Sequence, residues 1–116
     1  MSQSLAQNKC QPCEGMGSSL NSNQVQEKSK FVPEWNVSSD HKMISREFVV
    51  KNFMAAIHFI GKIAQIAEEE NHHPDIHLTS YRRLKIDLST HAVGGLSDND
   101  FILAEKIDQL PVELRK

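Results

Sequence analysis

The apolar pattern of residues 52–71 constrains the fold of this chain more than any other feature. Apolar side chains recur there at intervals of three and four residues, as on one face of an amphipathic helix: Phe53, Ala56, Ile57, Ile60, Ile63, Ala64 and Ala67. Asn52 is a suitable N-cap. Pro74 ends the helix, because proline has no N–H and forces the preceding residue out of the α region. We therefore expect one continuous helix over residues 52–71.

Two adjacent histidines, His72 and His73, stand between this helix and the proline, in the stretch ENHHPD of residues 70–75. Neighbouring side chains on a helix point about 100° apart, so both imidazoles face one ligand only where the helix ends. Pro74 indicates that it ends there. The position suits metal binding, acid–base chemistry or capping of the helix.

Four segments with strand character surround the helix. EWNVSS (34–39) and MISREFVV (43–50) predict an antiparallel hairpin. DIHLTSY (75–81) and RLKIDLST (83–90) predict two more strands, and in the second one Leu84, Ile86 and Leu88 alternate with polar residues.

Two further helices are expected at the ends of this region. Residues 20–32 predict a first helix that Pro33 ends. Ser97 and Asp100 resemble a capping box for a last helix, whose apolar residues are Leu103, Ala104, Ile107 and Leu110. The expected fold is α+β: a single four-stranded antiparallel sheet with helices packed on one face, in the order α-β-β-α-β-β-α.

The chain is expected to form one domain over residues 21–116, preceded by a flexible amino-terminal arm over residues 1–20 that is polar and rich in glycine and serine. The arm carries Cys10 and Cys13 in a C-x-x-C spacing. A second C-x-x-C pair that would complete a zinc site does not exist, and the polar context does not match a thioredoxin-like motif. Reduced thiols, a weak metal site and a redox contact remain the alternatives.

Composition excludes several classes of function. Lys and Arg number 13 against 15 Asp and Glu, which is not the basic balance of a general nucleic-acid binder. An apolar run of about 20 residues, as needed to span a bilayer, does not occur. The amino terminus lacks the apolar core of a secretory signal. We expect a cytoplasmic protein that binds neither nucleic acid nor membrane.

The other histidines differ in their context. His41 falls in the predicted hairpin turn and His58 on the long helix, and both are expected to be structural or solvated. His77 follows His73 at a spacing seen in helical metal pairs, but Pro74 removes the helix that would make the spacing useful. His91 ends a predicted strand, where it could meet His72 and His73 at the rim of the sheet. The alternative is that His72 only caps the helix end, His73 faces solvent and His91 is a turn residue.

The stretch from residue 68 to residue 100 resembles the signature of the pterin-4a-carbinolamine dehydratases. That pattern has an acidic residue, His-His-Pro, an aromatic residue, a later His and an Asp, and it falls here on Glu68, His72, His73, Pro74, Tyr81, His91 and Asp100. Residues 33–110 as a whole are similar to the family, and CQPCEG resembles the arm of some members. Asn71 departs from the pattern, because several relatives carry Asp there.

The resemblance implies which residues form the site. His72 and His91 would be the acid–base pair, and His73 would bind and orient the pterin, so all three are expected to be catalytic. Glu68 lies one helical turn before His72, where it can orient an imidazole. The remaining expected contacts to substrate are Asn71, Pro74, Ser89 and Thr90, and Tyr81 and Asp100 are expected to support the site.

The implied reaction is dehydration of a 4a-hydroxytetrahydropterin to the quinonoid dihydropterin, which recycles the tetrahydropterin cofactor. One group protonates the leaving oxygen and another takes the proton from N5, tasks that suit histidine near neutral pH without a metal or an organic cofactor. A homodimer or homotetramer is expected, with an aromatic amino acid hydroxylase as a possible member of the same pathway. The alternative is a binding module that acts as a dimerisation cofactor of a transcription factor through a helical surface.

Overall fold

Helices and strands follow one another in the order that the sequence predicts. The computed structural model describes residues 19–115. Its elements are α1 (Ser22–Ser29), β1 (Asn36–Val37), β2 (Ile44–Val49), α2 (Phe53–Glu70), β3 (Asp75–Thr79), β4 (Arg83–Leu88), the 3₁₀ helix η3 (His91–Val93) and α3 (Asp98–Asp108). The α+β class is confirmed.

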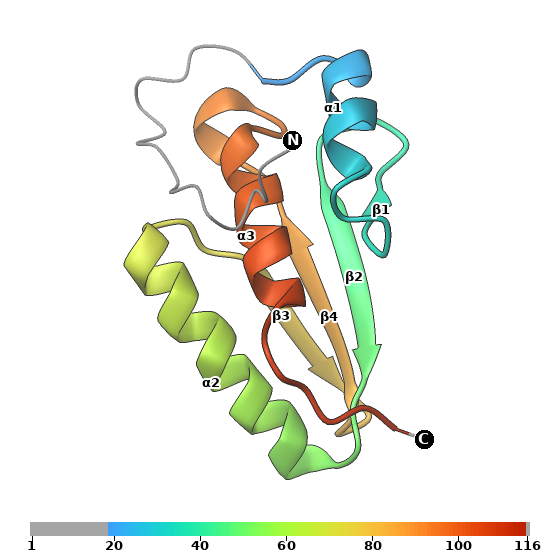
Figure 1. Cartoon of the computed structure of the whole chain (residues 1–116), viewed down its shortest axis with the longest axis vertical. Coiled ribbons are helices and arrows are strands. Elements are labelled where there is room, and N and C mark those ends of the chain that lie inside the picture. Colours follow the sequence, from blue (N-terminus) through green and yellow to red (C-terminus); the bar gives the residue numbers. More distant parts are fainter. Residues whose placement is uncertain (1–18, 116) are drawn as a thin grey trace.

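The four strands form one antiparallel sheet in the order β1-β2-β4-β3. The central strands β2 and β4 pair over their whole length, from Ile44 opposite Leu88 to Val49 opposite Arg83. Figure 1 shows α1, α2 and α3 together in front of one face of this sheet. The predicted packing of helices on one face is therefore confirmed.

The period-2 pattern of the strands decides which face the helices cover. The side chains that alternate towards the helices are fully or almost fully buried: Ile44 and Phe48 from β2, and Leu84, Ile86 and Leu88 from β4. From α2 the buried residues are Ala56, Phe59, Ile63 and Ala67. The rings of Phe48 and Phe59 meet edge to face with centroids 4.9 Å apart, which joins the sheet to α2.

Helix α3 lies between α1 and α2 against the sheet (Figure 1) and is the most buried of the three. Its burial extends to polar residues of the first turn, Asn99 and Asp100. Because buried polar groups need partners, this turn must be tied to its neighbours by hydrogen bonds.

The ends of α2 confirm the boundaries expected from the sequence. The side chain of Asn52 accepts a hydrogen bond from the N–H of Ala55 at 2.8 Å. At the other end Asn71 takes a left-handed conformation with φ of 52°, which closes the helix. The chain then enters β3 directly after Pro74.

Some expectations differ from the structure in detail. The first strand of the predicted hairpin is reduced to the two residues of β1. The break expected after β4 contains the short helix η3, which ends at Gly94 with φ of 69°. Cys10, Cys13 and almost all of the expected arm lie outside the described residues. Leu20, at the end of that arm, donates its N–H to the carbonyl of Leu96 at 2.8 Å and packs against the core.

The sheet has two distinct ends. At one end α2 finishes, β3 begins and β4 leads into η3 and α3. At the other end lie the β3–β4 turn, the start of α2 and the carboxy-terminal segment (Figure 1). There Val50 pairs with Leu114, and the N–H of Arg115 bonds to the carbonyl of Val49 at 2.9 Å. Backbone pairing therefore holds the carboxy-terminal segment beside the edge of β2.

The contact between α2 and the sheet provides a test of this core. Replacing Phe59 by Ala should lower the free energy of unfolding by about 3–5 kcal/mol, because a fully buried ring leaves a cavity. The neighbouring exposed change His58→Ala should alter it by about 0.5 kcal/mol or less. Chemical denaturation followed by circular dichroism measures both. Equal losses for the two variants would contradict the described packing.

Candidate active site

The end of α2 determines where the two adjacent histidines lie. The N–H of His72 bonds to the carbonyl of Ala67 at 3.1 Å, so His72 caps the end of the helix from the residue after Asn71. The left-handed conformation of Asn71 then turns the chain towards β3. As a result His72 is buried, with 5% of its surface exposed, whereas His73 is exposed.

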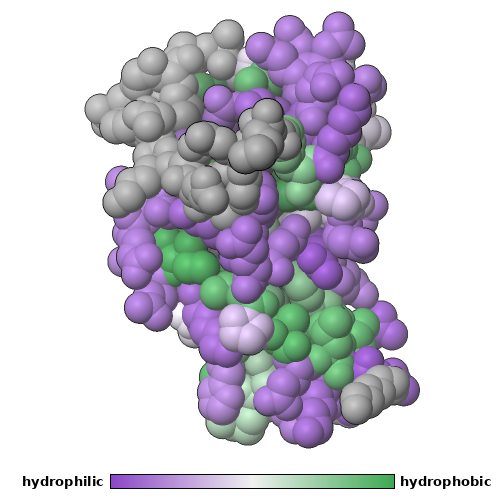
Figure 2. Space-filling model, viewed as in Figure 1, coloured by the Kyte–Doolittle hydropathy of each residue, from purple (hydrophilic) through white to green (hydrophobic). Residues whose placement is uncertain are grey.

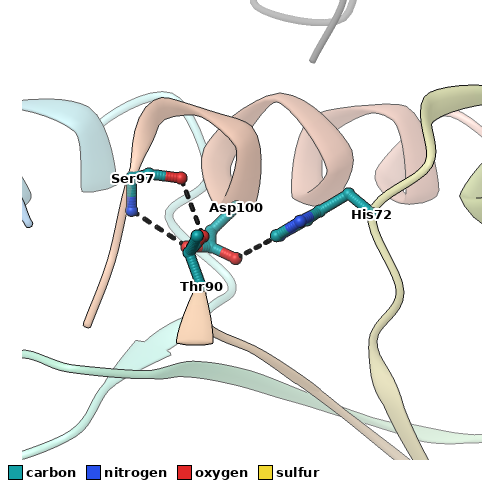
Figure 3. Close-up of polar contacts among 4 residues, drawn as sticks. All are labelled: His72, Thr90, Ser97 and Asp100. Carbon is teal, nitrogen blue, oxygen red and sulfur yellow. Dashed lines mark hydrogen bonds and ion pairs between the residues drawn. The ribbon is translucent and has the colours of Figure 1, made fainter. Parts of the chain in front are cut away.

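His72 forms a buried pair with Asp100. Its Nε2 lies 2.6 Å from Oδ1 of Asp100, whose side chain is completely buried (Figure 3). A carboxylate can only accept a hydrogen bond, so the imidazole donates from Nε2. In the neutral ring this leaves the lone pair on Nδ1, and the pair therefore selects one tautomer of His72.

The second oxygen of Asp100 is satisfied by the end of β4 and the start of α3. Oδ2 accepts from the hydroxyl of Thr90 at 2.7 Å and from the N–H of Ser97 at 3.0 Å. Because the Thr90 proton points at Asp100, the Ser97 hydroxyl donates to Thr90, 2.7 Å away. We call these four residues, drawn in Figure 3, the His72–Asp100 network.

The His72–Asp100 network joins three segments that are distant in the sequence. His72 follows α2, Thr90 follows β4, and Ser97 and Asp100 begin α3. All four residues are buried, so the hydrogen bonds work in a weakly polar interior, where a missing partner would be costly. The network therefore holds the three segments together at this end of the sheet.

A second imidazole–carboxylate pair lies on the surface beside it. Nε2 of His73 contacts Oε2 of Glu68, and both side chains are more than half exposed. Glu68 was expected to orient an imidazole, and the imidazole that it contacts is His73 rather than His72. The reason is the left-handed turn at Asn71, which breaks the helical relation between residue 68 and residue 72.

The remaining predicted contacts occupy the same two segments. Asn71 is exposed at the helix end, and Pro74 is half-buried next to His73. Ser89 is half-buried beside Thr90, and His91 opens η3 with an exposed side chain. The network ties these segments together through His72 and Thr90, so the three predicted histidines belong to one end of the sheet.

Tyr81 is the predicted site residue that the structure does not bring to this end. It stands in the β3–β4 turn, and the five residues of β3, at a rise of about 3.3 Å each, separate that turn from Pro74. Tyr81 is 48% exposed and has a left-handed backbone with φ of 56°. It contacts the guanidinium of Arg82 rather than a histidine.

Ser97 is the member of the network that the sequence did not assign to the site. Its role was expected to be capping, and the capping box with Asp100 does form. The signal that could have found it is the short Asp in place of Glu or Gln at the third helical position. A side chain that serves both the cap and a buried histidine must be held close to the backbone.

The other histidines have separate places. His41 is in the hairpin turn with φ of 58°, and His58 is exposed on α2. Nε2 of His77 lies 2.9 Å from Oδ2 of Asp87, whose Oδ1 accepts from the Ser45 hydroxyl, on the sheet face away from the helices. Within residues 19–115, three or more His, Cys, Asp or Glu side chains nowhere gather as a metal site would require. The helices of this region are too short or too polar to cross a membrane.

Fold and site together define a small α+β domain in which histidines gather at one end of a single sheet, an arrangement suited to proton transfer. Comparison with known proteins gives the class a name. Residues 18–110 match the family model described as pterin 4 alpha carbinolamine dehydratase. The chain belongs to this family of dehydratases, which are hydro-lyases.

Individual relatives agree with the family match. The chain is 40% identical over 107 residues to a "Putative pterin-4-alpha-carbinolamine dehydratase" of Halorhodospira halophila, covering 92% of this chain and 97% of that one. It is 40% identical over 117 residues to "Pterin-4-alpha-carbinolamine dehydratase 2, mitochondrial" of Arabidopsis thaliana, covering 97% of this chain and 63% of that one.

A solved structure shares the fold. The "transcriptional coactivator/pterin dehydratase from Brucella Melitensis" superimposes with a TM-score of 0.73 at 27% identity, over 78% of this chain and 96% of that one. The α+β architecture is therefore common to both proteins.

The first turn of α3 allows the network to be tested with a matched pair of variants. Asp100→Ala should lower the free energy of unfolding by about 3–5 kcal/mol, because it leaves His72, Thr90 and the N–H of Ser97 buried without their acceptor. Asp98 lies two residues away and is exposed, paired with Lys28 at 3.3 Å. Asp98→Ala should cost about 1 kcal/mol or less. Similar losses in urea titrations would contradict a stabilising role for the network.

Proposed function

We propose that the chain dehydrates 4a-hydroxytetrahydropterin to quinonoid dihydropterin and water by histidine acid–base catalysis. The bond from C4a to the hydroxyl oxygen breaks, and that oxygen leaves with a proton as water. N5 gives up its proton, and its electron pair forms the new double bond to C4a. One proton is supplied and one is taken, so the protein is unchanged after a turnover. The buried pair of His72 and Asp100 carries this proposal.

The pair prepares His72 for one half of the reaction. Because Nε2 donates its hydrogen bond to Asp100, Nδ1 is the nitrogen that can exchange a proton with the substrate. The carboxylate also stabilises the imidazolium that forms when Nδ1 accepts a proton, which favours a role as general base. Burial limits His72 to contact through its small exposed edge, and we propose that the pterin covers this edge when bound. Asp100 is then a positioning residue.

The exposed imidazoles at the same rim suit the other tasks. His91 follows Thr90 directly and is open to solvent, so it can donate a proton to the leaving hydroxyl. His73 is paired with Glu68 and can bind and orient the flat pterin beside Pro74. The backbone at Ser89 and Thr90 is the proposed contact for the pterin edge. Because the N–H of Thr90 already bonds to the carbonyl of Gly95 at 2.7 Å, this contact falls mainly to Ser89. Asn71 is at the exposed end of α2 and offers an amide to the same ligand.

A direct assay tests the proposed reaction. Chemically generated 4a-hydroxytetrahydropterin should lose water faster with the protein than without it, followed by the absorbance of the quinonoid product. His72→Ala or His91→Ala should lower kcat by about 100-fold or more, the scale for losing a general acid or base. His73→Ala should act mainly by raising KM, as when uniform binding is lost.

Control variants test whether the catalytic site is correctly placed. His41→Ala and His58→Ala remove imidazoles that are not part of the His72–Asp100 network and should keep wild-type kinetics. The double variant of His72 and His91 should lose less than the product of the single losses, because the two act on one reaction. If His72 and His91 were both dispensable in a folded protein, the proposed reaction would be wrong.

The cellular setting is proposed from the reaction itself. Turnover of the product to tetrahydropterin would recycle a cofactor, and an aromatic amino acid hydroxylase is the expected source of the substrate. A cytoplasmic location remains the prediction for this chain, whereas the name of the Arabidopsis relative places that protein in mitochondria.

A second role is proposed from the surface of α2. Phe53, Met54 and Ile57 are 41–56% exposed, and the space around Gly61 is open. Figure 2 shows apolar surface in the lower part of the molecule, where α2 begins. We propose that a second copy of the chain packs here in a homodimer or homotetramer, because Gly61 permits close approach of two helices and burial of the apolar residues drives association.

The alternative occupant of this surface is a transcription factor that the chain would help to dimerise. The supporting observation is that the similar Brucella protein is named a transcriptional coactivator. Sedimentation velocity tests the self-association. Wild type should sediment as an oligomer and Ile57→Glu as a monomer, while Gln26→Glu on exposed α1 should behave as wild type. A monomeric wild type would contradict the homo-oligomer and leave the surface free for a different protein.

A further inference from the structure

The end of the sheet opposite the histidines contains a pocket with a different chemistry. Its volume is about 560 Å³, and among the described residues it is lined by Lys51, Arg82, Glu113, Leu114 and Arg115. These residues come from three segments, the connection between β2 and α2, the β3–β4 turn and the carboxy-terminal segment (Figure 1). The volume is within the usual range for sites of small organic ligands.

Backbone hydrogen bonds hold the three segments in fixed positions. The N–H of Val50 bonds to the carbonyl of Arg82 at 3.0 Å, and the N–H of Lys51 bonds to the carbonyl of Glu113 at 2.9 Å. The N–H of Arg115 bonds to the carbonyl of Val49. The cationic side chains therefore project from a paired backbone rather than from a loose loop, which reduces the ordering cost of binding.

The charges of the lining are unbalanced. It carries three cations and one carboxylate, although the whole chain has a net charge of −2. Glu113 pairs with Lys51 at 3.7 Å. Among residues 19–115, neither Arg82 nor Arg115 has a carboxylate partner. Two arginines thus line one pocket without a carboxylate partner from the described part of the chain.

Arg82 is the most informative of these residues. Its Nε is buried and finds no hydrogen-bond acceptor among the described residues. Its guanidinium lies 4.9 Å from the centre of the Tyr81 ring, a cation–π contact. A buried donor without an acceptor is unfavourable, and a ligand could supply one only after a small movement of the side chain that exposes Nε. Nothing in the proposed dehydration uses this group.

From this pocket we infer a second ligand site, for a small molecule that carries phosphate groups. A guanidinium group can bind phosphate oxygens with two parallel hydrogen bonds. Two arginines beside Lys51 therefore suit a ligand that offers more than one phosphate oxygen. Leu114, 47% exposed, adds an apolar wall for an organic part of the ligand. A local group of cations in a pocket, on a chain whose net charge is −2, favours a small molecule over a membrane or a nucleic acid. The site is independent of the proposed dehydration.

Binding of inorganic pyrophosphate to the full chain tests the inference. Titration followed by ¹H–¹⁵N NMR should give saturable shifts at Lys51, Arg82 and Arg115, with His72 and His91 unchanged. Arg82→Gln and Arg115→Gln should each weaken binding by about tenfold, the scale of one charge-assisted hydrogen bond. Added NaCl should weaken it further.

Arg83 provides the matched control, because it is adjacent to Arg82, 58% exposed and paired with Glu47 at 3.5 Å outside the pocket lining. Arg83→Gln should bind pyrophosphate as wild type does. Thermal melting checks that each variant is folded. Absence of saturable binding in the millimolar range, equal loss in Arg83→Gln, or shifts centred on the histidines would overturn the second site. Tight binding to phosphatidic acid vesicles that pyrophosphate does not displace would overturn the small-molecule assignment.

Discussion

The end of the sheet that carries His72, His73 and His91 depends on the carboxylate of Asp100. It is completely buried, and it accepts three hydrogen bonds, one each from the imidazole of His72, the hydroxyl of Thr90 and the N–H of Ser97. Those donors follow α2, follow β4 and begin α3. A buried charge of this kind is tolerated only when its partners are complete. The buried charge of Asp100 is therefore compensated only when all three segments are correctly placed.

The same interaction links folding to the proposed chemistry. An imidazole that donates to a carboxylate has its other nitrogen free and its orientation fixed, which is what a proton acceptor in a catalytic site requires. The neighbouring imidazoles of His73 and His91 lie at the surface, where a substrate can reach them. The division between one buried and two exposed histidines gives the site a fixed part and an accessible part. The basic pocket lies at the opposite end of the sheet and shares no lining residue with this site.

The helix boundaries and buried strand positions that depend on local periodicity were predicted from the sequence. Helix α2 was located to within one residue, because its apolar face, its N-cap Asn52 and the following proline all lie within one stretch. The alternation in β4 likewise predicted which side chains are buried. The order of the elements then left few ways to cover one face of an antiparallel sheet.

Contacts between distant residues were less accessible to the sequence. His72 and Asp100 are 28 positions apart, and only the resemblance to a family suggested that they belong to one site. Ser97 was recognised as a cap but not as a site residue, because periodicity does not report which side chains share a hydrogen bond. Tyr81 matched the family pattern and yet lies at the other end of β3. The pairing of Glu68 with His73 depends on the left-handed turn at Asn71, which helical spacing alone does not predict.

The tautomer of His72 in solution tests the central claim most directly. Long-range ¹H–¹⁵N NMR of the imidazole at a pH where the ring is neutral distinguishes a proton on Nε2 from one on Nδ1. The structure predicts the Nε2–H form in the wild type, held by Asp100, and a loss of this preference in folded Asp100→Asn. A proton on Nδ1 in the wild type, or a mixture of tautomers that Asp100→Asn does not alter, would contradict the account.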